Sequence, residues 1–197
     1  MDLKQICLEI AKSDSSKGVE KILKDNKLWD ETGSNWKLVG AIDENHDIQN
    51  HSIIGNQQSS PSRALVEKLV NCGDSALMLL CQQKNIDPKS NEAPNSTSEA
   101  IENLFGIREG KWLNAEGEKT RELADKFCKL VVTGERGSGA KPCYTIIDEA
   151  EGQSPKDFNT TFLSTTLQNK VKISFVQGKF GMGSHGALPF CGNGLEL

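Results

Sequence analysis

The sequence lacks a long apolar run, a polybasic run and an apolar signal core. No window reaches the roughly 20 apolar residues of a membrane helix, so we expect no spanning segment and no membrane partner. Lys and Arg number 23 against 27 Asp and Glu, and the net charge of −4 argues against intrinsic nucleic-acid binding by this segment. The start, MDLKQICLEI, carries an early acid and no signal pattern, which predicts a cytoplasmic protein.

Metal and disulfide patterns are also missing. The six cysteines form no C-x-x-C pair and have no histidine at ligand spacing, which argues against a zinc site or a disulfide framework. We therefore expect reduced and mostly buried thiols.

The 197 residues suffice for one domain with a small appendage. Apolar spacing predicts two short amphipathic helices before residue 28, so residues 1–30 are expected to form an N-terminal helical segment and residues 31–197 the main domain. The clearest element is a long helix over 60–84, with Ser60 as N-cap and Pro61 at its first position.

The rest of the chain mixes helical and strand patterns. Residues 86–98 are rich in Ser, Asn and Pro and predict a mobile loop, and Ser98 is expected to cap the helix that follows. Further helices are expected over 118–130 and 157–166, and strands over 36–42, 129–136, 143–149 and 171–176. GSGAKP, between the second and third of these strands, indicates a hairpin, and the whole pattern indicates an α/β protein.

Three groups of residues could carry chemistry. On the long helix, the spacing of Glu67, Asn71 and Asp74 places them on one face, although a plain surface helix also shows such a polar stripe. Asp148, which ends a strand, could accept a hydrogen bond from an exocyclic amine, or the run to Gly152 could be an ordinary acidic turn. The third group, GKFGMG over 178–183, could present backbone N–H groups to phosphate, although flexible linkers look similar.

Taken in order, VEKLVNCGDSAL, IIDEAEGQSPKDF and QGKFGMGSHGAL resemble the motifs of the GHKL ATPases, the superfamily of DNA gyrase, the heat-shock chaperone, histidine kinases and MutL. The resemblance implies a Bergerat-type fold, a two-layer α/β sandwich with helices on one face of a mixed sheet. ATP and Mg²⁺ would bind between the layers. The segment over about 86–127 is a helical insertion relative to the family.

The resemblance also implies residue roles. Glu67 matches the carboxylate that activates the attacking water, and Asn71 the Mg²⁺ ligand. Asp74 matches a recurrent acid near the adenine end of the helix. Asp148 matches the aspartate that reads the adenine amino group, with Gly152 beside the base. The lid around the phosphates matches Gly178, Lys179, Gly181 and Gly183.

Two departures from the family pattern bear on the function. Ala150 replaces the first glycine of the D-x-G-x-G motif, at a cost of about 1 kcal/mol if φ there is positive. The chain ends soon after the lid, so we expect a fragment of a larger ATPase, slow or inactive alone, with partners in downstream domains of the same polypeptide and a possible homodimer on ATP binding. A nucleotide-gated interaction module with little turnover, or a histidine-kinase catalytic domain, are the alternatives.

Overall fold

The computed structural model describes residues 2–29, 59–134, 137, 142–161, 170–178 and 186–190. These ranges contain five α-helices and a two-stranded antiparallel sheet, which confirms the expected mixture of helices and strands. The helices are α1 Leu3–Lys12, α2 Ser16–Asp25, α4 Pro61–Gln83, α5 Thr97–Phe105 and α6 Glu118–Lys126, and the strands are β1 Lys129–Gly134 and β2 Pro142–Ile147. Short 3₁₀ helices cover Arg108–Gly110, Trp112–Asn114, Pro155–Thr160 and Leu188–Phe190.

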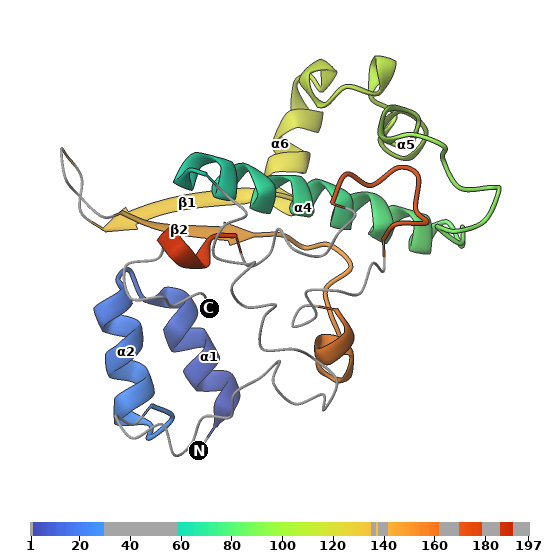
Figure 1. Ribbon diagram of the computed structural model, residues 1–197. Helices are drawn as coiled ribbons and strands as arrows, with labels where there is room; N and C mark the ends of the chain where they lie inside the picture. Colours follow the sequence, from blue (N-terminus) through green and yellow to red (C-terminus); the bar gives the residue numbers. More distant parts are fainter. Residues whose placement is uncertain are drawn as a thin grey trace.

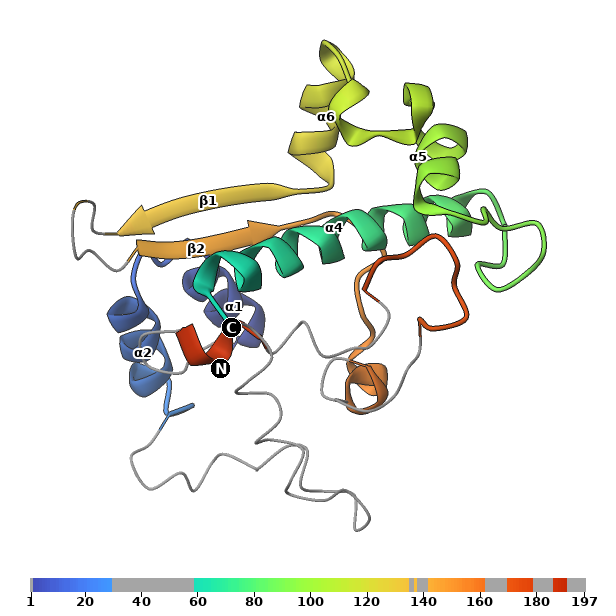
Figure 2. The ribbon, with the colours of Figure 1, turned by 45° about the horizontal axis from the view of Figure 1, so that its top comes forward.

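The long helix α4 organises the molecule. It runs along the β1–β2 hairpin, with α5 and α6 at one end and the α1–α2 pair towards the other (Figures 1 and 2). The hairpin meets the α1–α2 pair where the Thr133 hydroxyl donates to the Asp14 carbonyl, 3.4 Å away. Within the described ranges, no helix is long and apolar enough to cross a membrane.

The beginning of α4 follows its sequence signals. The Ser60 hydroxyl accepts a hydrogen bond from the Arg63 N–H at 3.4 Å, and Pro61 occupies the first helical position. Both predictions for this helix start are confirmed, because the cap and the proline act within a few residues of the helix they begin.

The predicted cap of α5 is wrong by two residues. Ser96, not Ser98, accepts from the Glu99 N–H at 3.2 Å, and the Glu99 carboxylate accepts from the Asn95 N–H at 2.9 Å. Ser96 and Glu99 have the S-x-x-E spacing of a capping box, whereas the residue three positions after Ser98 is Ile101.

The core lies between α4, the segment expected to be an insertion, and residues 173–176. Helices α4 and α5 bury Ala76, Leu77 and Ile101 in one cluster. Its other buried members are Cys81, Ala93, Ala100, Phe105, Ile107, Phe127, Ile173, Phe175 and Val176. Residues 86–127 therefore supply six of the buried members of this cluster, whereas α4 supplies three.

Residues 86–98, expected to be a mobile loop, form a folded connection. The Asp87 carboxylate accepts from the Lys89 N–H at 2.9 Å, and the Ser90 hydroxyl donates to the Asp87 carbonyl at 2.8 Å. Ala93 is only 7% exposed. Side chains that satisfy the backbone locally, together with one buried apolar residue, fix this polar segment in place.

The hairpin confirms two predicted strands. β1 and β2 pair antiparallel, with Val132 opposite Tyr144 and Leu130 opposite Ile146. Most of the GSGAKP turn, and the strand expected over 36–42, lie outside the described residues.

The strand predicted over 171–176 is wrong. These residues form turns, and Ile173, Phe175 and Val176 are all buried although the last two are adjacent. The Phe175 carbonyl accepts from the Thr97 hydroxyl at 2.9 Å, so a side chain satisfies a peptide group that a strand would pair with another strand. The helix predicted over 157–166 is the 3₁₀ helix Pro155–Thr160, and residues 162–169 lie outside the described part.

Candidate nucleotide site on helix α4

Glu67 and Asn71 lie one helical turn apart in the middle of α4, on the face predicted from their spacing. Both are half-buried. Within the described ranges neither side chain makes a hydrogen bond, and no polar atom there is both buried and unpaired. Their oxygens therefore stay open to a ligand.

Asp74 has a different environment on the same face. It is 2% exposed, and its Oδ1 and Oδ2 accept from the Gln177 N–H at 3.0 and 3.1 Å. Oδ2 also accepts from the Gly178 N–H at 2.7 Å. These contacts hold residues 170–178, here called the strap, against the second half of α4, as its red trace in Figure 1 shows.

Gly178 marks the closest approach of the strap to the helix. A Cβ at this position would lie 2.8 Å from Asn71 Oδ1 and 3.2 Å from Asp74 Oδ2. The first distance is too short for real atoms, so a side chain here would displace the Asn71 carboxamide. Glycine is thus required where the strap passes the candidate metal ligand.

Asp148 reaches α4 from the sheet. It directly follows β2, and its Oδ1 accepts from the Ala150 N–H at 3.1 Å. Its Oδ2 accepts from the Cys72 Sγ at 3.8 Å, between residues 76 positions apart in sequence. Asp148 itself is exposed, so its carboxylate remains accessible beside the helix.

The Cys72 thiol is held in its neutral form. Burial, and after it the neighbouring Cys128 and Asp148, which disfavour a second negative charge, together raise its pKa to about 12. The neutral thiol donates a hydrogen bond to Asp148, which makes Cys72 a contact of the candidate site that the sequence did not reveal. The five cysteines in the described ranges are free.

The turn over residues 148–152, here called the Asp148 turn, tolerates alanine in its middle. The non-glycine residues with positive φ in the described ranges are Lys27, Asn85 and Glu109, so Ala150 carries no left-handed strain. Gly152 does have positive φ, at +64°, with open space around it. The cost considered for Ala150 therefore does not arise.

Glu151 lies within the same turn. Burial raises the pKa of its carboxyl and Asp148 adds to this, while Lys170 at the start of the strap lowers it. Lys170, the first residue of the strap, is thus close enough to influence the Glu151 carboxyl electrostatically.

Compared with known proteins, the chain matches no family model, no curated protein and no solved structure.

The donor set around Asn71 fits Mg²⁺. The carboxamide oxygen of Asn71 is a hard ligand, and Gly178 leaves it free of a neighbouring side chain. No group of three or more His, Cys, Asp or Glu side chains in the described ranges could hold a metal alone. Mg²⁺ commonly takes one or two protein oxygens and completes its shell with phosphate and water, which suits this arrangement.

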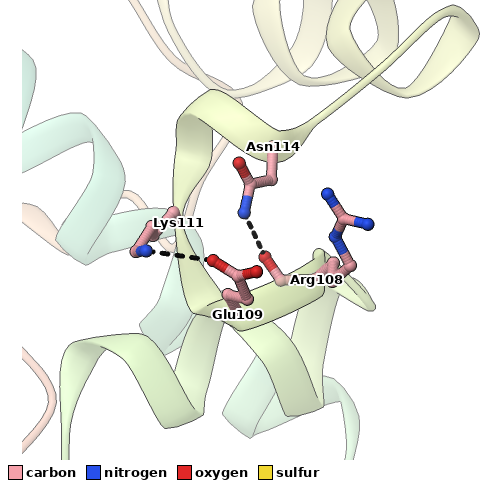
Figure 3. Close-up of polar contacts among 4 residues, drawn as sticks. All are labelled: Arg108, Glu109, Lys111 and Asn114. Carbon is pink, nitrogen blue, oxygen red and sulfur yellow. Dashed lines mark hydrogen bonds and ion pairs between the residues drawn. The ribbon is translucent and has the colours of Figure 1, made fainter.

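The turn over residues 108–114, which follows α5, contains a residue with left-handed backbone conformation. Glu109 has φ +59°, its carboxylate pairs with Lys111 Nζ at 3.0 Å, and Asn114 Nδ2 donates to the Arg108 carbonyl at 2.8 Å (Figure 3). These contacts offset the strain of the left-handed residue.

The same turn carries Trp112 onto the helix. Gly110 packs so closely that a Cβ there would collide with the Ser98 carbonyl. Trp112 then meets the Phe105 ring edge-on at 5.0 Å, and its ring edge lies 4.0 Å from the Cβ position of Gly73. The helix is thus supported next to the residues that face the candidate site.

The structure brings four of the predicted site residues, Asn71, Asp74, Asp148 and Gly178, to one turn of α4. The Asp148 turn and Gly178 both converge on residues 71–74 of α4. Lys179, Gly181 and Gly183 lie outside the described residues. Thr97 and Cys72 were missed, because no local pattern marks a hydroxyl or thiol whose partner lies about 75 residues away.

Proposed function

We propose that this chain binds ATP with Mg²⁺ and hydrolyses it, as the N-terminal domain of a larger GHKL-type ATPase with a Bergerat-type fold. In this fold, helices including α4 cover one face of a mixed sheet to which β1 and β2 contribute, and ATP lies between the layers. Cytoplasmic residence, downstream domains in the same polypeptide and dimerisation on ATP binding belong to the same proposal.

The convergence on α4 is the observation that carries the proposal. Cys72 and Asp148 are 76 positions apart and Asp74 and Gly178 are 104 apart, yet both contacts fall within one turn of the helix. An open carboxylate, an open carboxamide and the start of a glycine-rich segment are the groups that adenine, Mg²⁺ and phosphates require.

The residues divide the work by their chemistry. Asp148 accepts a hydrogen bond from the adenine amino group, and Asn71 offers its carboxamide oxygen to Mg²⁺. When bound, Mg²⁺ supplies positive charge that neutralises the phosphate oxygens. Glu67 orients the attacking water and accepts its proton, so catalysis consists mostly of positioning.

A passive nucleotide-gated module is the second candidate. Within the described part of the chain, no side chain hydrogen-bonds to the Glu67 carboxylate and orients it. A base that is not oriented activates water poorly. Binding without useful turnover would then switch a partner of the chain.

Calorimetry with a nonhydrolysable ATP analogue tests binding. We expect the analogue to bind with a measurable heat. Its affinity should fall at least about tenfold when Mg²⁺ is chelated, since Mg²⁺ offsets phosphate charge. Asn71→Ala should remove this dependence on Mg²⁺. Gln83→Ala, which shortens an exposed side chain at the other end of α4, is the matched control and should bind as the parent chain does. No heat with the parent chain would contradict the proposal.

Phosphate release separates an ATPase from the passive module. Removal of a general base slows turnover by about 10²–10⁴-fold, so Glu67→Ala should retain analogue binding and lose hydrolysis. Equal rates in the parent chain and the variant would favour the passive module.

A further inference from the structure

Two cysteines meet beside Asp148, between α4 and the hairpin. The Cys72 Sγ donates to Asp148 Oδ2 at 3.8 Å, and the Cys72 thiol has Cys128 as a second side-chain hydrogen-bond partner. Both cysteines are free thiols. Their sulfur atoms therefore lie within hydrogen-bonding range of each other, although one belongs to a helix and the other precedes a strand.

The hairpin register also places Cys128 next to Asp148. The first residue of β1 pairs with the last residue of β2, and the next residues outward along the two strands are Cys128 and Asp148. Just beyond them, the Glu149 N–H donates to the Lys126 carbonyl at 2.8 Å, so the two chains stay together past the ladder. Cys128 thus lies opposite the residue that the Cys72 thiol contacts.

The two thiols differ in their access to solvent. Cys72 is 4% exposed in the middle of α4, whereas Cys128, in the connection between α6 and β1, is only half-buried. A small oxidant therefore reaches Cys128 first. An accessible thiol with a second thiol beside it is typical of redox-sensitive pairs, in which the second thiol attacks the oxidised first one.

We infer that Cys72 and Cys128 form a peroxide-sensitive thiol pair, whose oxidation to a disulfide joins α4 to the start of β1 and removes the hydrogen-bond donor of Asp148. The inference is independent of the proposed function, because it assigns neither thiol a contact with nucleotide. In a reducing compartment the pair stays reduced, and the disulfide forms only when a peroxide is present.

The reaction consumes one hydrogen peroxide for each disulfide. The Cys128 sulfur attacks a peroxide oxygen, the O–O bond breaks, and the departing hydroxide takes the thiol proton and leaves as water. Cys128 is thereby oxidised to a sulfenic acid and the peroxide is reduced. The Cys72 sulfur then attacks the Cys128 sulfur, the S–O bond breaks, and the second hydroxide leaves as water with the Cys72 proton.

Peptide mapping by mass spectrometry after treatment with hydrogen peroxide tests the pair. In the folded chain, the cross-link between Cys72 and Cys128 should be at least about tenfold more abundant than any other pair, since thiols in contact react at a high effective concentration. Dithiothreitol should remove this cross-link. The same treatment in urea should give a mixture of pairs, because unfolding separates the two thiols. Oxidation of Cys128 to a sulfinic acid while Cys72 stays a free thiol would overturn the inference.

Serine variants separate this pair from general thiol oxidation. Cys128→Ser should form no disulfide at Cys72, whereas Cys143→Ser should cross-link as the parent chain does. Cys143 is the matched control, since it is also half-buried and lies at the other end of the hairpin, in β2. Cys128→Ala gives the same comparison if the serine variant fails to fold. A Cys72 disulfide that is as abundant without Cys128 as with it would contradict the pairing.

The melting temperature measures the join between α4 and β1. A disulfide that closes a loop of about 55 residues restricts the unfolded chain, so the oxidised parent chain should melt several degrees above the reduced chain. Peroxide should not raise the melting temperature of Cys128→Ser. An oxidised parent chain that melts below the reduced chain would show that the fold does not hold the two thiols face to face, and the inference would be wrong.

Discussion

An aspartate lies on each of two sides of α4, and the two have opposite settings. On the strap side, Asp74 is 2% exposed and holds two amides at 2.7 to 3.1 Å. On the sheet side, Asp148 is exposed, and its contact with the helix is one thiol at 3.8 Å. The Asp74 carboxylate is occupied by backbone donors, whereas the Asp148 carboxylate remains accessible.

This difference separates a carboxylate that the fold holds from one that stays accessible, although both residues are aspartates. A carboxylate whose lone pairs face buried amides stabilises the segment it holds, and its removal leaves unpaired donors. A carboxylate at a turn beside a helix keeps capacity for an incoming donor. The comparison therefore predicts large stability effects on the strap side and small ones on the sheet side.

The largest expected effect is at Phe175, which is 0% exposed in the core under the strap. Phe175→Ala should lower the free energy of unfolding by about 3–5 kcal/mol through lost burial and a cavity. Tyr144→Ala, at a 54% exposed position of β2, should cost less than about 1 kcal/mol. Urea unfolding of both variants measures the difference, and similar costs would erase the contrast between the two sides.

The next effect compares two glycines near the site. Gly178→Ala should cost about 1–3 kcal/mol because its Cβ would lie 2.8 Å from Asn71 Oδ1. Gly73→Ala in α4 meets its nearest atom at 4.0 Å, so helix propensity should make it stabilising by about 0.5–1 kcal/mol. The two variants should shift the melting temperature in opposite directions. An unchanged melting temperature in Gly178→Ala would show that the strap moves to make room for the Cβ atom.

A third variant tests the sheet side through backbone conformation alone. Gly152 has φ +64° and no atom within 4 Å of its Cβ position, so Gly152→Ala should cost about 1 kcal/mol from the left-handed backbone. Gly152→Asn should recover part of this, because asparagine tolerates the conformation. Denaturant titration checks the order of the three chains. A larger loss with Asn than with Ala would point to steric contact instead.

The smallest effect concerns Glu151 and pH. Burial raises the pKa of its carboxyl, so its contribution to stability is fully present below the ordinary value of 4.5 and is lost as pH rises through the raised value. Glu151→Gln should match the parent chain near pH 4 and be up to about 0.5 kcal/mol more stable at pH 7. Melting at both pH values measures this, and a variant less stable at pH 7 would mean that attraction to Lys170 outweighs burial.

Local signals in the sequence predicted local structure well. Ser60 and Pro61 begin α4 as expected, and two runs rich in β-branched residues predicted both strands of the hairpin. The prediction that failed depended on contacts between residues far apart in the sequence. Residues 171–176 have a strand composition, yet the core takes adjacent side chains there and Thr97 satisfies a carbonyl, so tertiary contacts override the pattern.

In the candidate site, too, the local features could be predicted and the long-range contacts could not. Helical spacing was enough to place Glu67 and Asn71 on one face, and the strand end was enough to expose Asp148. The pairing of Asp74 with Gln177 could not be predicted, because a buried carboxylate and its amide donors 103 positions away leave no periodic trace. The roles in nucleotide binding stay predictions until the titrations are done.

The hydrogen bond between Asp74 and Gln177 can form only after both residues have been synthesised. Closing a loop of 103 residues costs about 4 kcal/mol of chain entropy, which favours early formation of the hairpin and the contacts of α4 with α5. At about 5–20 residues per second, a ribosome takes roughly 5–20 s to travel from Asp74 to Gln177. During that interval the apolar face of α4 is without the strap and its carboxylate is hydrated. The nascent chain should therefore be most open to chaperones and proteases in this window, and the candidate site should be among the last parts to mature.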